Sequence, residues 1–395
     1  MKTTWHFLYL IIITLLFISC DKEIKEETLK TPAPKTILIY MLGDNSLNKF
    51  VDQNIKSIKE NILQYDINAS NLLIYIDKIN AAPKLIQLKP ENENIKEILI
   101  DTYDTQQNSA TAETLHAIVE KIHKDFPADS YGLILWSHGS AWFPSNYNKV
   151  RSRSFGEDKF GNSIEINDLA SALSKFHFDF ILFDACYMAS TEVVYSLRKN
   201  ADYIIGSPTE IMGEGFPYRY IMNYMFQKKA DVIAIANQFY EYYKNSYGSI
   251  SVIKTANLDK LALSCQTILQ DKTKDDIFTL PVYSMQVLEY LTPSPHALYD
   301  FDNYISHLAT KEQYGIFHKV LEEAIIYKAS TPQAYYALIG SAIEIKKFCG
   351  LSTYIPQENL PELNEWYKTL EWYKDIYLNP TSPFAHSMVT TSPRK

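Results

Sequence analysis

The sequence predicts an α/β fold built on a mostly parallel sheet with helices on both faces. Between residues 36 and 207, continuous apolar runs of strand length alternate with segments of helical periodicity. Strands that are buried on both faces of a parallel sheet are apolar throughout, so these runs favour a parallel sheet over an antiparallel one with a solvated face. Beyond about residue 226 helical patterns dominate, which predicts a mainly helical region closing onto the sheet.

The elements are expected in the following order. Strands are predicted at 36–42, 71–77, 131–137, 178–186 and 201–207, with weaker ones near 85–88 and 98–100. Helices are predicted at 47–63, 109–126, 166–176 and directly after Cys186, and the second of these has a Ser/Thr cap. Later helices are predicted at 230–247, 258–270, 299–308, 313–329 and 362–377, with a strand at 248–254 and a candidate strand pair at 341–356. We therefore divide the chain into a core over 36–253, a mainly helical region over 254–380 and a tail over 381–395.

Residues 1–20 have the layout of an export signal. A short charged start precedes an apolar run from Trp5 to Ile18, and a small residue and Cys20 follow. The run is shorter than the roughly 20 residues that a membrane-spanning helix needs. "LLFISC" resembles a bacterial lipoprotein box, which implies that Cys20 is lipidated and anchors the mature chain to the cell envelope; plain secretion is the alternative. Residues 21–35 are charged and contain prolines, so we expect a flexible tether.

Charge and cysteine content exclude several classes of partner and site. The formal net charge is −8 with no basic block, so neither nucleic acid nor an acidic membrane surface is a natural partner. Besides Cys20, the cysteines are Cys186, Cys265 and Cys349, too few and too widely spaced for a disulfide scaffold. We expect Cys265 and Cys349 to be buried structural thiols. No zinc-ligand spacing and no glycine-rich phosphate loop occurs, so we expect no cofactor.

Two strand ends carry residues suited to covalent catalysis. "YGLILWSHG" ends at His138 and Gly139, and "FILFDAC" ends at Cys186. Sites in parallel sheets lie outside the carboxyl ends of the strands. A cysteine at the start of a helix is favoured as thiolate, and a neighbouring histidine can take its proton and return it to a leaving amine. The amides of Gly139 and Cys186 are candidate oxyanion donors. The alternative is a small buried thiol with an unrelated histidine.

The segments "YGLILWSHGSAW" and "FDFILFDACYMASTEVVYSL" resemble the two active-site blocks of the clostripain family of cysteine peptidases. Further similar segments are "YMLGDNSL", "FPADSYG", "ADYIIGSPTE" and "GLSTYIP", so the resemblance runs from about residue 36 to about residue 377. The family belongs to the caspase-like clan. The resemblance therefore implies a caspase-like αβα sandwich and an endopeptidase, with His138 as general base and acid and Cys186 as nucleophile.

The resemblance also implies a specificity and a mode of activation. Asp184 would line the primary specificity pocket, with Glu214 as a second acidic residue, which implies substrates cleaved after Arg and less readily after Lys. The alternative is that Asp184 caps the following helix. Several family members cleave themselves between the two blocks, and calcium stimulation occurs in the family, although no acidic loop for calcium is recognisable here. The loop 144–161 offers three cationic candidates for self-cleavage, unless it is only a solvated loop: Lys149, Arg151 and Arg153.

Two other classes of function compete with the endopeptidase. One is a catalytically silent surface lipoprotein that binds peptide or glycan on a caspase-like scaffold. The other is a hydrolase or transferase that uses the same dyad on non-peptide amides. Selective labelling of Cys186 by a thiol-reactive arginine mimic would separate a peptidase from the silent binder, and loss of the Arg or Lys preference would identify the third class.

Overall fold

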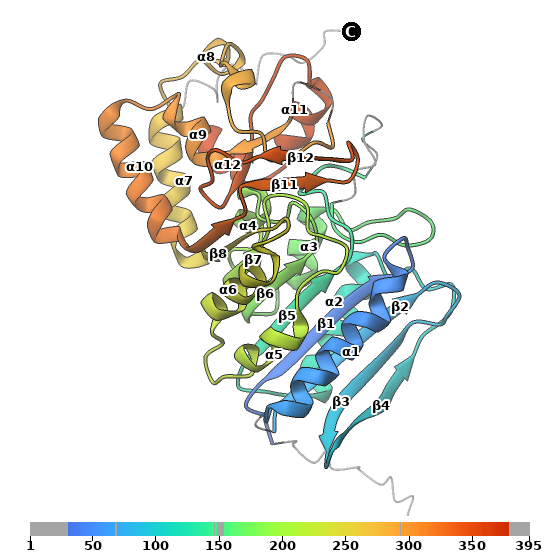
Figure 1. The fold of residues 1–395 in the computed structure, drawn as a ribbon. Coiled ribbons are helices and arrows are strands. Elements are labelled where there is room, and N and C mark those ends of the chain that lie inside the picture. The colour runs from blue at the N-terminus through green and yellow to red at the C-terminus, as the bar shows by residue number, and fades with distance from the viewer. Residues whose placement is uncertain are drawn as a thin grey trace, which may run out of the picture. The chain divides into compact units, whose positions relative to one another are not determined.

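The computed structural model describes residues 31–67, 69–145, 147, 154–292, 294 and 296–378. Within them, the chain from Pro32 onward forms one compact unit around a nine-stranded sheet (Figure 1). The strand order is β10-β8-β7-β6-β5-β1-β2-β3-β4. These strands are β1 (Thr36–Gly43), β2 (Asn71–Lys78), β3 (Lys84–Glu91), β4 (Asn94–Thr102), β5 (Tyr131–Trp136), β6 (Phe178–Asp184), β7 (Ala201–Gly206), β8 (Ser249–Lys254) and β10 (Ile325–Ser330).

Most of this sheet is parallel, as the sequence predicts. β1 pairs in parallel with β2 on one side and with β5 on the other, and β6 and β7 continue the parallel ladder beyond β5. Among the described strands of this sheet, only β3 and β8 run in the opposite direction, because each is antiparallel to both of its neighbours. β1 is buried at every residue, which explains why its sequence is apolar throughout rather than alternating.

Helices cover both faces of the sheet and complete the predicted αβα sandwich. On the face turned toward the viewer in Figure 1 lie α1 (Asn48–Gln64), α5 (Tyr218–Met225) and α6 (Val232–Tyr243). On the other face lie α2 (Ala112–Asp125), α3 (Ile166–Leu173), α4 (Thr191–Ser196) and α7 (Leu258–Leu269). Successive side chains of β1 enter the two cores in turn: Ile37 and Ile39 pack with the first set of helices, and Leu38 and Tyr40 with the second.

The chain beyond α7 adds short elements to the second core and one strand to the main sheet. Two small antiparallel sheets form here, β9 with β13 and β11 with β12. No described helix combines the length and the apolar character that crossing a membrane requires. The remaining elements are η1 (Thr255–Asn257), α8 (Lys274–Phe278), η2 (Val282–Ser284), β9 (Leu298–Asp300), α9 (Phe301–Ser306), α10 (Lys311–Ala324), β11 (Gln333–Tyr336), β12 (Ser341–Glu344), β13 (Ser352–Tyr354), α11 (Pro361–Tyr367) and α12 (Glu371–Tyr377).

Several expectations for this region are wrong in detail. The helix predicted at 313–329 ends at Ala324, and the residues after it form β10, which pairs with β8 at the edge of the main sheet. The strand pair expected within 341–356 does not form, because β12 pairs with β11 and β13 pairs with β9. The helix expected at 362–377 is divided into α11 and α12. The partner of a strand depends on long-range contacts, which a local pattern does not record.

Candidate active site

The structure brings the histidine and cysteine blocks together at one edge of the sheet. β5 and β6 are parallel neighbours with Trp136 opposite Asp184, and the Ser137 N–H donates to the Asp184 carbonyl at 3.3 Å. Gly139 then passes directly over residues 185–189, which contain Cys186 and are called the nucleophile turn below. A Cβ at Gly139 would lie 2.7 Å from the carbonyl oxygen of Cys186, so only glycine allows this approach. The strand-end placement predicted for both blocks is therefore confirmed.

Cys186 lies in a turn that is held by the neighbouring loop, and it is not in the first turn of a helix. The Tyr187 N–H donates to the Thr209 carbonyl at 2.9 Å, and the Ala189 N–H donates to the Ser207 carbonyl at 3.0 Å. α4 begins only at Thr191, with Ser190 as its cap. The expectation that a helix N-terminus stabilises the Cys186 thiolate is therefore wrong, because residues 187–189 pair with the segment after β7 instead of with a helix.

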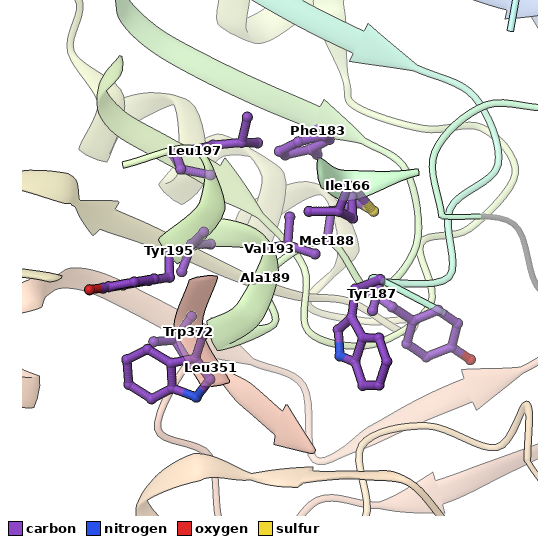
Figure 2. Close-up of a cluster of buried hydrophobic side chains, with 14 of the residues drawn as sticks. Ile166, Phe183, Tyr187, Met188, Ala189, Val193, Tyr195, Leu197, Leu351 and Trp372 are labelled. Atoms are coloured by element: carbon purple, nitrogen blue, oxygen red, sulfur yellow. The ribbon is translucent and has the colours of Figure 1, made fainter. Parts of the chain in front are cut away.

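The residues that follow Cys186 in the nucleophile turn are buried in the second core. Tyr187, Met188 and Ala189 are all buried, and Figure 2 shows them beside Phe183, Val193 and other side chains of the second core. Tyr187 adopts a left-handed backbone with φ of 64°, a conformation that costs a residue other than glycine of order 1–3 kcal/mol. The buried side chains on both sides hold the turn in this conformation and fix the position of Cys186.

The Cys186 thiol is neutral at ordinary pH in this conformation. Burial, with a smaller contribution from the nearby Glu210 carboxylate, raises the pKa of the thiol to about 12. The Ile211 N–H opposes this shift, because it points at Sγ from 3.3 Å. Glu210 itself is fixed by the Tyr187 hydroxyl and the Ala337 N–H, both at 2.8 Å. Attack by the sulfur therefore needs a base that removes the thiol proton. Glu210 and Ile211 are not recognisable from the sequence pattern.

His138 is half-buried and has identifiable partners on one ring nitrogen. Its Nε2 lies 2.8 Å from the hydroxyl oxygen of Ser46 and 3.7 Å from a carboxylate oxygen of Glu157. Its carbonyl accepts the Gly156 N–H at 2.9 Å, which ties the histidine to the loop between the two blocks. Sequence reasoning missed Ser46 and Glu157. The segment "YMLGDNSL" that contains Ser46 was noted only for its family resemblance.

The backbone pairing of Gly139 with Phe155 directs the Gly139 N–H away from Phe155. Gly139 and Phe155 face each other as an antiparallel bridge. The hydrogen bonds of this bridge run from Gly156 N–H to the His138 carbonyl and from Ser140 N–H to the Ser154 carbonyl. In such a pair the central residues direct their own N–H groups outward. The Gly139 N–H therefore points away from residues 154–156, and its part as an oxyanion donor stays a prediction.

Asp184 is buried at the end of β6 and does not cap α4. Its carboxylate accepts the Phe216 N–H at 3.1 Å and the Tyr218 hydroxyl at 2.8 Å. Burial raises the pKa of this carboxyl to about 6, against the two hydrogen bonds. Gly215, with φ of +70°, packs so closely that a Cβ there would lie 2.6 Å from Oδ2. The capping alternative is excluded because Ser190 caps the helix.

The remaining candidate residues lie after β7 in the chain or outside the described residues. Glu214 is exposed in the loop after β7, and its carbonyl accepts the Asn54 side-chain N–H at 3.1 Å. Cys265 and Cys349 are buried free thiols, as expected. Lys149, Arg151, Arg153 and Cys20 lie outside the described residues. The Ser154 hydroxyl lies 2.9 Å from both the Phe143 carbonyl oxygen and a Glu165 carboxylate oxygen, and its single proton can donate to either. No cluster of metal-ligating side chains occurs in the described part.

Comparisons with known proteins identify relatives over most of the chain. A family model described as the clostripain family matches residues 39–382. Clostripain from Hathewaya histolytica is 25% identical over 237 residues, which cover 50% of this chain and 44% of clostripain, so the chain matches less than half the length of that relative.

Two solved structures are similar over nearly their whole length. One is an inactive zymogen of a C11 protease from Parabacteroides distasonis, 56% identical, with a TM-score of 0.83 over 88% of this chain and 99% of that one. The other is a secreted C11 cysteine protease from Bacteroides thetaiotaomicron in complex with an irreversible peptide inhibitor. It is 33% identical, with a TM-score of 0.78 over 88% of this chain and 100% of that one.

Proposed function

Since the chain belongs to the clostripain family of cysteine peptidases and shares its caspase-like fold, we propose that it is an endopeptidase that cleaves after Arg, and less readily after Lys. The observation that carries this proposal is the meeting of Gly139 with the Cys186 turn at the shared edge of β5 and β6. His138 as general base, Cys186 as nucleophile and the Gly139 N–H as oxyanion donor would then work from this one region. This arrangement fits acyl transfer better than passive binding of peptide or glycan.

The proposed reaction follows from the roles of these groups. His138 takes the proton of the Cys186 thiol, and the sulfur attacks the carbonyl carbon of the scissile bond. The N–H groups of Gly139 and Cys186 bind the oxyanion that forms. His138 then gives its proton to the leaving amine, which leaves a thioester on Cys186. Water hydrolyses the thioester and regenerates the thiol, and no cofactor is assigned a part in these steps.

The specificity assigned to Asp184 is tested by removing its charge. In Asp184→Asn we expect kcat/KM for peptides with Arg before the scissile bond to fall by about 10²-fold or more, because loss of one partner of a buried charge pair costs about 2–5 kcal/mol. Cleavage of a mixed peptide library, read by mass spectrometry, gives the preference directly. Asp300→Asn, which alters a buried aspartate that caps α9, is the matched control and should keep the preference. If the Arg preference is unchanged in Asp184→Asn, another acidic residue binds the arginine side chain of the substrate. Glu214→Gln is then the next variant to measure.

Self-cleavage in the loop 144–161 is proposed as the activating step. The intact mass of the purified wild-type chain should reveal a break after Lys149, Arg151 or Arg153, because these cationic residues match the proposed specificity. Cys186→Ala should remain uncut under the same conditions. A break of equal extent in both proteins would show that another protease makes the cut.

We also propose that the mature chain is exported and lipid-anchored through Cys20. A secreted relative supports export, and the residues before position 21 support the anchor. The mass of the mature N-terminal peptide from an envelope fraction distinguishes a diacylglyceryl-modified Cys20 from an unmodified secreted chain.

A further inference from the structure

We propose that Ser46 is a positioning residue that orients His138 and selects the tautomer in which Nδ1 is the base. The inference rests on the proposed Cys-His mechanism and adds a residue to it. Its basis is the 2.8 Å contact between the Ser46 hydroxyl oxygen and His138 Nε2. The contact joins two strand ends that are neighbours in the sheet, since Ser46 follows β1 and His138 follows β5.

The turn that carries Ser46 is rigidly held, although Ser46 itself is exposed. The neighbouring Asn45 is buried, and its side-chain N–H group donates to the Leu42 carbonyl at 3.0 Å and to the Glu157 carbonyl at 2.8 Å. Its side-chain oxygen accepts the Leu47 N–H at 2.8 Å. Through these hydrogen bonds Asn45 connects the end of β1, its own turn and the backbone of Glu157. A hydroxyl on so constrained a backbone can fix the orientation of the imidazole ring.

We assign the donor role in this hydrogen bond to Nε2–H, because the Ser46 hydroxyl can either donate or accept, whereas the Glu157 carboxylate near the same nitrogen only accepts. In a neutral imidazole one nitrogen carries the proton and the other accepts one, and the hydrogen bond made by the first determines which nitrogen is the base. With Nε2–H donating to the Ser46 oxygen, Nδ1 holds the lone pair. The Cys186 S–H proton then moves to Nδ1, and from Nδ1 it passes to the nitrogen of the leaving amine.

Glu157 adds an electrostatic contribution to the same orientation. Its carboxylate oxygen lies 3.7 Å from Nε2 and is attracted to the imidazolium that exists while the proton resides on His138. Ser46 and Glu157 therefore approach the same ring nitrogen from two different loops. The thiol of Cys186 depends on this base, because the pKa of the thiol lies well above neutral pH.

The test compares hydroxyl removal with hydroxyl retention in the self-processed full chain. Ser46→Ala should lower kcat by about tenfold to hundredfold with KM little changed, similar to the effect of removing the partner that orients a metal-bound histidine. Ser46→Thr keeps the hydroxyl and should restore kcat to within about threefold of wild type. Ser284→Ala is the matched control, because Ser284 is an exposed serine whose hydroxyl bonds only the nearby Pro281 carbonyl at 2.8 Å in the described residues.

A spectroscopic measurement separates orientation from general stability. In ¹⁵N-histidine spectra, the His138 signals of the wild type and Ser46→Thr should be those of the Nε2–H tautomer, and Ser46→Ala should shift toward a mixture. Wild-type kcat in Ser46→Ala, while His138→Ala is inactive, would overturn the role of Ser46 and leave the proposed dyad intact. Retained activity in His138→Ala would instead overturn the dyad, and the role of Ser46 with it.

Discussion

Replacing Cys186 by alanine is expected to lower kcat/KM for Arg and Lys peptides by at least about 10⁴-fold, because the acyl intermediate of the proposed reaction forms on its sulfur. The fold should persist, since the turn is held by the backbone hydrogen bonds of Tyr187 and Ala189 and by buried neighbours rather than by the thiol. Hydrolysis of a fluorogenic Arg peptide, together with thermal unfolding of the same sample, measures both quantities.

The matched control is Cys265→Ala. Cys265 is a fully buried thiol in α7, and burial raises its pKa far above neutral, so it is inert. This variant should keep full activity and lose about 0.5–3 kcal/mol of unfolding free energy. If wild type and Cys186→Ala release the same small amount of product, with the loop intact and with it nicked, the silent peptide-binding scaffold is the better description.

Replacing Gly139 by alanine is expected to give the second largest loss. The added Cβ would lie 2.7 Å from the Cys186 carbonyl oxygen, 2.9 Å from Met188 Sδ and 3.1 Å from Ala185 Cβ, so the nucleophile turn must move. Displacement of a reacting group by about 1 Å costs about 10²-fold, and loss of an oxyanion donor costs about 10²–10³-fold. We expect kcat to fall by about 10²–10³-fold and the unfolding free energy by about 1–3 kcal/mol.

Gly315→Ala tests whether this effect is specific to the site. Gly315 lies in α10, and a Cβ there would meet nothing within 4 Å. The alanine should stabilise the helix by about 0.5–1 kcal/mol without changing kcat. Steady-state kinetics and thermal unfolding of both glycine variants decide the matter. Wild-type kcat in Gly139→Ala would show that the two catalytic blocks do not need this close contact.

The relation between sequence and site is clearest in β5 and β6. Both strands are mostly apolar, because they are buried on both faces of the sheet, and reactive residues follow each of them directly. Parallel strands place such ends at the same edge. The meeting of the two blocks at one sheet edge was therefore predictable without coordinates, as were the sandwich and the buried state of Cys265 and Cys349.

The surroundings of the two residues were not predictable in the same way. The sequence after Cys186 has helical character, but α4 starts at Thr191 because the N–H groups of Tyr187 and Ala189 bond a segment about twenty residues further along the chain. Similarly, the local sequence of β10 predicts the end of a helix, but in the structure β10 pairs antiparallel with β8. Local periodicity does not indicate these long-range hydrogen bonds.

By itself, the sequence determined the α/β class, the strands from β1 to β8 and the candidate pair of reactive residues, because apolar periodicity and residue chemistry are local properties. Only the tertiary structure decided which groups act on that pair. Ser46 and Glu157 meet His138, and Glu210 and Ile211 meet Cys186, from loops that are distant in sequence or have no periodic pattern. The pKa of the thiol and the orientation of the imidazole depend on distances of a few ångströms between such loops, and these distances exist only once the sheet has assembled.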